Sequence, residues 1–212
     1  LINALLSVVW IGAMSNAFNF LDNMDGLSAG IGAICLIFLG FAALLAGEPG
    51  IAVVCIMSFG ACCGFLLYNL PPASIFMGDA GSLFLGYAIS AMAAYLSQTY
   101  SEIHIDPALR WAPILLVSIP IYDFISVNFL RIKRGQAPWI GDQNHISHRL
   151  VRLGLSRRNA VLCIYLATVL SGIPSLLSIQ LTGQTLWLWC APVSLFLLAL
   201  ADTYWYRAPE PE

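Results

Sequence analysis

The chain has 212 residues, of which 59% are hydrophobic and only 9% charged, and its mean hydropathy is +0.83. A soluble domain carries about 25% charged residues, so this composition excludes a soluble protein and predicts one embedded in a membrane. The formal net charge of −2 is too small to indicate a partner, whereas the distribution of the basic residues is informative.

Apolar runs close to the ~20 residues that cross a ~30 Å hydrocarbon layer as a helix recur along the chain. No ten-residue alternating pattern indicates a membrane β-barrel. We therefore predict an all-α, polytopic helical bundle that forms one membrane-embedded domain over residues 1–212. About seven transmembrane helices are expected, at about 2–20, 27–46, 51–70, 82–98, 111–130, 159–179 and 185–205.

All six cysteines lie inside these apolar spans, and none forms a C-x-x-C pair. Cysteine in such a setting behaves as a small hydrophobic residue. We expect the six side chains to serve helix packing.

Seven of the nine Lys and Arg residues lie in the segment 131–158. Cytoplasmic loops of membrane proteins are enriched in Lys and Arg, so we expect this segment to be cytoplasmic. Counting spans outward from it places the loops at about 21–27 and 71–81 on the same side. These three loops contain the polar stretches of the chain, which predicts one shared site.

The first stretch, NAFNFLDNMDG at 16–26, places Asn16, Asn19, Asp22 and Asp25 at every third position. Residues at this spacing are neighbours on a helix surface, so their oxygen atoms would converge at one helix end. Two structural roles stay open. Asp25 could cap the next helix, and Asn16 could form a hydrogen bond between helices.

The second stretch, NLPPASIFMGDAGS, sets Asp79 among glycines, which permit close approach of the backbone to a ligand. Asp79 is the best candidate for a metal ligand, with a plain turn or capping aspartate as the alternative. Ser82 is placed to cap the following helix. Phe76 suits stacking on a base or anchoring at the membrane interface.

The third stretch, DQNHISHRL, holds His145, His148 and Arg149, which could share one helix face. A zinc site would need a third soft ligand, and Arg149 would repel the cation. Imidazole and guanidinium groups suit phosphate oxygens instead. Because the oxygen ligands of the other two stretches suit Mg²⁺, the sequence predicts metal-assisted phosphoryl transfer at the cytoplasmic membrane surface.

In this order, the three stretches resemble motifs of the polyprenyl-phosphate N-acetylhexosamine-1-phosphate transferase family. NAFNFLDNMDGLSAG resembles its N-x-x-N-x-x-D-G-x-D-G-L-A-x-G stretch, and FMGDAGSLFLG resembles its F-M-G-D-x-G-S-L stretch. DQNHISHRLVRLGLS is similar to its histidine loop, H-x-H-H-R-L, and IPIYDF with Asp123 is similar to a feature one span earlier. The resemblance covers nearly the whole chain.

The resemblance implies transfer of N-acetylhexosamine-1-phosphate from a UDP-sugar to undecaprenyl or another polyprenyl phosphate, with release of UMP, as the initiating step of cell-envelope polysaccharide synthesis. The spaced histidines favour UDP-N-acetylglucosamine as donor. The implied cofactor is Mg²⁺, or Mn²⁺, and the implied location is the plasma membrane, with a multi-pass chain and a cytoplasmic active site. No nucleic-acid partner is expected, and a homodimer is allowed.

Roles for individual residues follow from the same resemblance. Asn19 and Asp79 would hold the metal, and Asp25 and Phe76 would contact the uracil. The residues implied to face the pyrophosphate are His145, His148 and Arg149. The catalytic set implied is Asp22, Asp79, His145 and His148.

Three departures from the family pattern stand out. Asn23 occupies a position where the pattern has glycine, which could alter the turn, and Ser147 replaces the middle histidine. The paired aspartates that precede the first motif in the family have no counterpart here. Since the chain also begins at Leu1 inside an apolar run, without the basic flank of a signal peptide, we expect an N-terminally truncated fragment that is inactive alone.

Rival functions stay open at this point. A transferase that uses the muramoyl-pentapeptide nucleotide is one, although its histidines are consecutive. An ion-coupled transporter is another, with a relay through Asp22, Asp25, Asp79 and Asp123. A scaffold that has lost activity is the third, suggested by the residues at 23 and 147. Mg²⁺-dependent release of UMP would separate the transferase from the last two.

Overall fold

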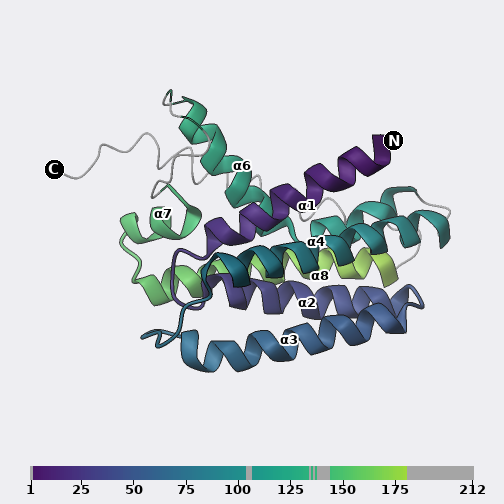
Figure 1. Ribbon diagram of the computed structural model, residues 1–212, viewed down its shortest axis with the longest axis horizontal. Coiled ribbons are helices and arrows are strands. Elements are labelled where there is room, and N and C mark those ends of the chain that lie inside the picture. The colour runs from purple at the N-terminus through teal and green to yellow at the C-terminus, as the bar shows by residue number, and fades with distance from the viewer. Residues whose placement is uncertain (1, 104–106, 134, 136, 138–143, 181–212) are drawn as a thin grey trace.

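The computed structural model describes residues 2–103, 107–133, 135, 137 and 144–180, and these form helices without a strand (Figure 1). The predicted all-α class is confirmed. The helices that the structure describes are α1 (Ile2–Leu21), α2 (Leu27–Leu45), α3 (Pro49–Asn69), α4 (Gly78–Ile103), the 3-10 helix η1 (Pro107–Trp111), α5 (Ala112–Leu115), α6 (Ser118–Lys133), α7 (Ile146–Arg152) and α8 (Arg157–Gln180).

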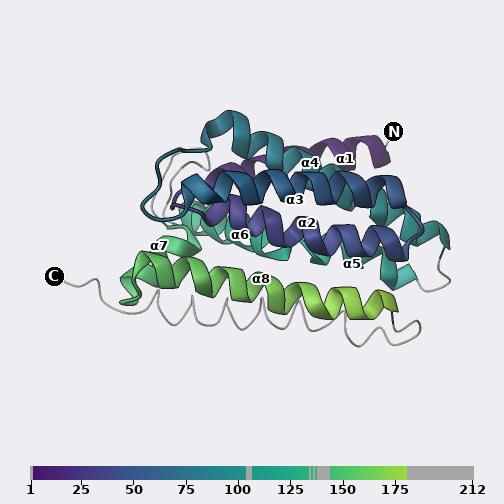
Figure 2. The same ribbon diagram turned by 90° about the horizontal axis from the view of Figure 1, so that it is seen from below.

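Helix α2 forms the centre of the bundle, and α3 lies at its edge. α2 packs against α3, α4 and α8, while α1 packs against α4 and α6 (Figures 1 and 2). Over their most apolar stretches, 72% of α2 is buried inside the protein but only 11% of α3. Because α3 is as apolar as α2, its outer surface requires lipid or another apolar partner.

Four described helices are long and apolar enough to cross a membrane, namely Leu27–Leu45, Pro49–Asn69, Gly78–Ile103 and Arg157–Ile179. They match the second, third, fourth and sixth predicted spans. The first predicted span is α1, whose described apolar part, Leu5–Leu21, is shorter. The seventh, at 185–205, lies outside the described residues. The polytopic membrane class is confirmed for the part of the chain that the structure describes.

The fifth predicted span, 111–130, is not one straight helix. The helical segments Leu109–Leu115 and Ser118–Lys133 meet at an angle of 70°. Pro120 explains the break, because a proline lacks the N–H that would bond the carbonyl four residues earlier and its ring clashes with that carbonyl. The carbonyl in question is that of Leu116, which lies 3.5 Å from Cys35 Sγ instead.

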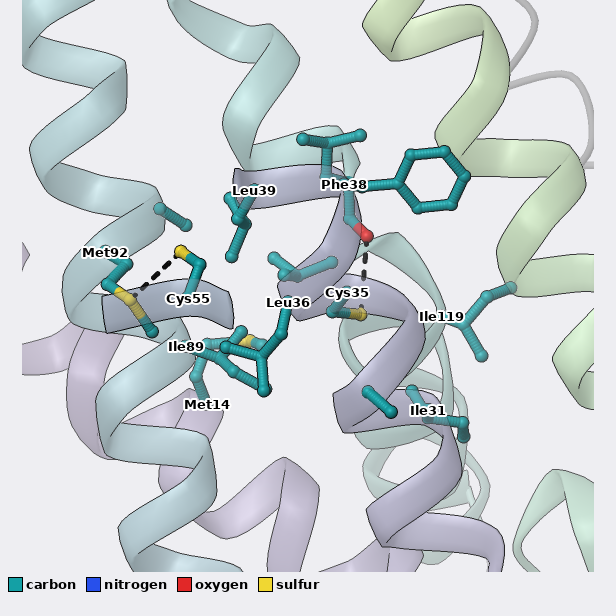
Figure 3. Packing of buried hydrophobic residues seen from close by; sticks show 14 of the residues in the cluster. Met14, Ile31, Cys35, Leu36, Phe38, Leu39, Cys55, Ile89, Met92 and Ile119 are labelled. Atoms are coloured by element: carbon teal, nitrogen blue, oxygen red, sulfur yellow. Dashed lines mark hydrogen bonds between the residues drawn. The ribbon is translucent and has the colours of Figure 1, made fainter. Parts of the chain in front are cut away.

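Buried hydrophobic residues fill the space between α1, α2, α3, α4 and α6 (Figure 3). Cys55 and Met92 face each other there, with their sulfur atoms 3.4 Å apart. The described cysteines are free thiols, and Cys35, Cys55 and Cys62 are buried, which confirms a packing role for these three. Cys163 is exposed on α8, where it contributes little to packing, and Cys190 lies outside the described residues.

The three polar stretches lie at one end of the bundle, on the left in Figure 1. The end of α1 and start of α2, the connection from α3 to α4, and helix α7 with the start of α8 meet there. Hydrogen bonds between these segments, described below, confirm the prediction that they form one cluster.

Candidate active site

A close approach of two helix backbones places the first two polar stretches side by side. A Cβ atom at Gly86 of α4 would lie 2.7 Å from the backbone oxygen of Met14 and from Cα of Ser15 on α1. Glycine is therefore required for the two helices to pack this closely. One turn from this contact on each helix, Asn19 and Ser82 come within hydrogen-bonding distance.

Asn19 joins the first stretch to the second. Its Nδ2 atom donates to Asp79 Oδ1 and to Ser82 Oγ, both at 3.0 Å. Asp79 lies in the first turn of α4 and is exposed. The two residues predicted to hold a metal are therefore in direct contact.

Two expectations about these stretches are wrong. Helix α4 begins at Gly78, four residues before Ser82, so Ser82 is not its cap; the hydroxyl donates to the Gly78 carbonyl within the helix instead. Asn16 does not join the convergent oxygen ligands, and it forms no bond between helices. It is exposed and donates to the carbonyl of Gly12, one turn earlier on its own helix.

Asp22 lies half-buried beside the start of α4, just beyond the end of α1. Burial raises the pKa of its carboxyl, the Gly78 backbone N–H lowers that pKa, and the nearby Asp79 carboxylate raises it again. The net effect is an increase. Asp22 and Asp79 are thus two neighbouring acids whose charges repel each other.

Asp25 links the first loop to the second and does not cap α2. Its Oδ2 accepts a hydrogen bond from the Ala73 N–H at 3.1 Å, and the residue at the N-cap of α2 is Gly26, without a side-chain cap. Gly26 has a φ of 76°, which favours glycine. Its N–H donates to Asn69 Oδ1 at 2.9 Å, and its carbonyl accepts from the Tyr165 hydroxyl at 2.5 Å.

Phe76 is the most exposed aromatic ring of this region, with 76% of its surface accessible. It lies in the 70–77 connection that Asp25 holds through Ala73. Either predicted role, stacking on a base or anchoring at the membrane interface, needs an exposed ring, so exposure leaves both open. The sequence missed Asn69 and Tyr165, and nothing in their immediate sequence context marks them as loop anchors.

Asp123, on α6, holds the histidine segment (residues 144–152) in place. Its Oδ2 lies 2.8 Å from His145 Nδ1, and its Oδ1 accepts the Ile146 backbone N–H at 2.7 Å. Asp123 is fully buried and His145 nearly so. Because both carboxylate oxygens are engaged at the N-terminus of α7, Asp123 acts as an anchor, which does not favour the proton relay of a transporter.

The two histidines differ in their setting. His145 precedes α7, as its N-cap, and His148 lies in the first turn, so they do not lie on one helix as expected. His148 is half-buried. Burial lowers its pKa, and electrostatic interactions with His145, Arg152 and Arg157 lower it further, against an opposing effect of Asp123. Its imidazole is therefore more readily neutral than a solvent-exposed one.

Arg149 lies inside the protein and not on the surface of the site. The side chain is 1% exposed, and Nη2 donates to Ser126 Oγ on α6 at 2.9 Å. The guanidinium thus reinforces the packing of α7 on α6, beside the contact made by Asp123.

Phe20 connects the two groups of residues. Its place between Asn19 and Asp22 is the one feature of the sequence that points to this role. Its ring stacks on Phe124 with a centroid separation of 5.9 Å and meets the edge of His145 at 5.6 Å. The Arg131 guanidinium lies 5.1 Å from the same ring, a geometry that favours a cation–π interaction. The end of α1 is thereby packed against α6 and the histidine segment.

A hydrogen bond between residues 124 positions apart makes a second connection. Ser147 Oγ donates to Asn23 Oδ1 at 2.5 Å. The two positions that depart from the family motifs therefore touch each other. Position 23 does not require glycine, because no non-glycine residue in the described part of the chain has a positive φ.

The donor set at Asn19, Asp22 and Asp79 fits Mg²⁺. Among the described residues, no group of three or more His, Cys, Asp or Glu side chains could hold a metal ion. Mg²⁺ does not require such a group, because it typically uses one or two carboxylates with water and substrate phosphates. The repulsion that contributes to the raised pKa of Asp22 is of the kind that a divalent cation relieves.

Fold and site together define a class: a polytopic helical membrane protein with an acidic, oxygen-rich group and a histidine-bearing helix at one end of the bundle. Comparison with known proteins narrows it. Residues 1–97 match the model of glycosyl transferase family 4. The chain belongs to this family.

Three relatives illustrate the similarity. The probable undecaprenyl-phosphate N-acetylglucosaminyl 1-phosphate transferase of Bacillus subtilis is 40% identical, over 91% of this chain and 51% of its own length. The decaprenyl-phosphate N-acetylglucosaminephosphotransferase of Mycolicibacterium smegmatis is 35% identical, over 76% and 44%. The undecaprenyl-phosphate alpha-N-acetylglucosaminyl 1-phosphate transferase of Escherichia coli K12 is 30% identical, over 78% and 44%. The chain spans about half the length of the curated relatives it matches.

Proposed function

We propose that the full-length protein transfers N-acetylglucosamine-1-phosphate from UDP-N-acetylglucosamine to undecaprenyl or another polyprenyl phosphate and releases UMP. A phosphorus–oxygen bond to the lipid phosphate forms, and the pyrophosphate bond to UMP breaks. The names of the relatives, which all specify a polyprenyl-phosphate N-acetylglucosamine phosphotransferase, support this acceptor and this sugar over the muramoyl-pentapeptide alternative.

The observation that carries the proposal is the meeting of acidic and histidine-bearing segments at one end of an apolar bundle. Asn19, Asp22 and Asp79 come from α1 and α4, and His145 and His148 come with α7. A water-soluble nucleotide sugar and a lipid phosphate can both reach a site at the end of a membrane-spanning bundle.

The acidic group would take the cation. Asn19 and Asp79 would hold Mg²⁺, with Asp22 adjacent, and the ion when bound supplies Lewis-acid polarisation of phosphoryl oxygens. Mn²⁺ suits the same oxygen ligands. Asp25 and Phe76 would contact the uracil from neighbouring loops that the Asp25–Ala73 hydrogen bond holds together.

The histidine segment would receive the pyrophosphate. Asp123 engages Nδ1 of His145, which leaves Nε2 as the nitrogen that can meet a phosphate oxygen. His148, with its lowered pKa, can accept a proton near neutral pH. Arg149 would add positive charge from its position against Ser126.

We assign this end of the bundle to the cytoplasmic face of the plasma membrane. Six of the basic residues of 131–158 lie in α6, α7 and α8 at this end, namely Arg131, Lys133, Arg149, Arg152, Arg157 and Arg158. An excess of Lys and Arg is typical of cytoplasmic loops. UDP-sugars would then reach the site from the cytoplasm.

The test is release of UMP by the purified full-length protein in lipid, with UDP-N-acetylglucosamine, undecaprenyl phosphate and Mg²⁺. We expect UMP only when the lipid phosphate and the divalent cation are both present. The 212-residue chain assayed alone is expected to be inactive, since the family's paired aspartates have no counterpart in it.

Two comparisons sharpen the assay. The muramoyl-pentapeptide nucleotide as donor should release no UMP, and omission of undecaprenyl phosphate separates transfer from simple hydrolysis. If no UDP-hexosamine yields UMP with lipid and Mg²⁺ present, the transferase proposal fails and an inactive scaffold takes its place.

A further inference from the structure

Two residues that depart from the family motifs, one in each half of the site, are hydrogen-bonded to each other. Asn23 stands where the pattern has glycine, and Ser147 stands where it has the middle histidine. Ser147 is completely buried, and its hydroxyl donates to Asn23 Oδ1. The substitutions are therefore neighbours in space, although 124 positions separate them in the chain.

The Asn23 amide is used at both ends, which fixes its orientation. Its Nδ2 donates to the Phe20 carbonyl at 2.5 Å while its Oδ1 accepts from Ser147. A carbonyl oxygen can only accept, so the amide nitrogen must face Phe20 and the amide oxygen must face the serine. The last turn of α1 and the first turn of α7 are thus joined through one side chain.

A second contact closes a ring between the same two segments. The Phe20 ring meets the edge of His145 at 5.6 Å, two residues before Ser147, and Asp123 holds both His145 and the Ile146 N–H. Two described contacts therefore link the histidine segment directly to the end of α1, beside Asp22, the neighbour of Asn23. One of them is the Asn23–Ser147 hydrogen bond.

We propose that Asn23 and Ser147 are a matched pair of positioning residues that sets the distance between the acidic group and the histidine segment. The pair replaces the glycine and the histidine of the family motifs, and each residue is compatible only with the partner from its own pair. This inference rests on the proposed transferase function. Since Ser147 is fully enclosed, an imidazole there needs space that the Asn23 side chain occupies, and glycine at 23 would provide it. Glycine at 23 or histidine at 147 should lower activity when introduced alone, and the two together should be tolerated.

The first arm of the test measures the contact without activity. Hydrogen–deuterium exchange of residues 144–152 is compared in detergent-solubilised full-length wild type, N23A, S147A and the N23A/S147A double variant. Loss of a hydrogen bond of ordinary strength should speed exchange about fivefold. The double variant should match either single one, because both remove the same bond. Effects that multiply in the double variant would overturn the pairing.

The second arm measures UMP release. S147A and N23A should lower kcat about tenfold. They should leave KM for the UDP-sugar nearly unchanged, because the Asn23–Ser147 hydrogen bond does not hold Asp25 and Phe76, the proposed uracil contacts. S147T, which keeps the hydroxyl, should recover most of the loss. A change in KM alone, or no recovery in S147T when its exchange is normal, would contradict a positioning role.

The third arm exchanges the pair. S147H should be slower than wild type in kcat and faster in exchange, and N23G/S147H should return to within about threefold of wild type in both. The matched control is S101H, at an exposed position on the opposite end of α4, which should change neither. If N23G/S147H is no better than S147H, the two positions do not compensate each other.

The arms separate the two proposals. Wild-type protein that releases no UMP defeats the transferase function, and the exchange measurements then decide the pairing by themselves. Wild type that releases UMP while N23A and S147A leave both kcat and exchange unchanged defeats the pairing alone.

Discussion

Asp79 and Asp123 are the same chemical group placed in opposite settings. Asp79 is exposed in the first turn of α4, and the described protein contact to its carboxylate is the Asn19 amide. Asp123 is fully buried, and both its oxygens are engaged by the histidine segment. The Asp79 carboxylate is accessible to a ligand, whereas the Asp123 carboxylate is fully engaged in hydrogen bonds within the protein.

The two parts of the site therefore have different roles. The acidic group of Asn19, Asp22 and Asp79 keeps polar oxygens accessible although its two acids repel each other. Burial is the main cause of the raised pKa of Asp22, and the nearby Asp79 carboxylate adds to it. The histidine segment is instead held rigidly by buried hydrogen bonds. Four variants test whether the two carboxylates differ in this way.

The largest effect is expected for Asp79→Asn in the full-length protein. Removal of the charge should reduce Mg²⁺-dependent UMP release by about 100-fold or more, the range seen when one group that stabilises transition-state charge is lost. Unfolding temperature should stay unchanged, since Asp79 is exposed. Activity equal to wild type would contradict the metal assignment.

Gly86→Ala should disturb the acidic group without touching it. The added methyl would collide with the α1 backbone, costing about 1–3 kcal/mol in stability, and would push Asn19 away from Asp79, lowering kcat. Gly64→Ala on α3 is the control, because nothing lies within 4 Å of its Cβ. Thermal unfolding and UMP release measure both effects, and equal behaviour of the two variants would refute the close approach.

Asp123→Asn should lower stability and activity together. The loss of charged hydrogen bonds to His145 and to the Ile146 N–H should cost about 1.5–3 kcal/mol, and kcat should fall about tenfold. Glu102→Gln, at an exposed site on the far end of α4, serves as the control. A variant with normal stability but reduced activity would mean that Asp123 contacts substrate and is no mere anchor.

The smallest effect concerns pH. The folded-state pKa of His148 lies below its ordinary value of 6.5, so below pH 6.5 the unfolded chain binds more protons and stability falls as pH falls. His148→Gln should remove this contribution. Unfolding temperatures recorded from pH 7.5 to 5.5 should therefore decline less in the variant than in wild type, and parallel curves would show that His148 is not responsible.

Much of the fold follows from the sequence because lipid imposes simple rules. Every backbone polar group in the membrane must bond internally, so runs of ~20 apolar residues become helices, and four of the predicted spans match long apolar helices. Pro120 indicates the break in the fifth span, but a count of apolar residues takes no account of proline.

The candidate site divides in the same way. Spacing and residue type alone indicated Asn19, Asp22 and Asp79 as a group, and the structure brings them together. The same spacing wrongly included Asn16, because a three-residue period drifts around a helix by 60° per step and Asn16 comes to face outward. Asp25 was open between capping and ligand binding, and capping is excluded because the N-cap of α2 is Gly26, without a side-chain cap.

The membrane class, the polar loops at one end and the family can all be predicted from the amino-acid sequence, since each depends on local composition or on ordered short motifs. The contact partners are known from the folded chain alone: Asp123 with His145, Phe20 with His145, Gly26 with Tyr165, and Asn23 with Ser147. These contacts join residues up to 139 positions apart. No local pattern encodes them, because they exist only where packed helices bring distant side chains within hydrogen-bonding distance.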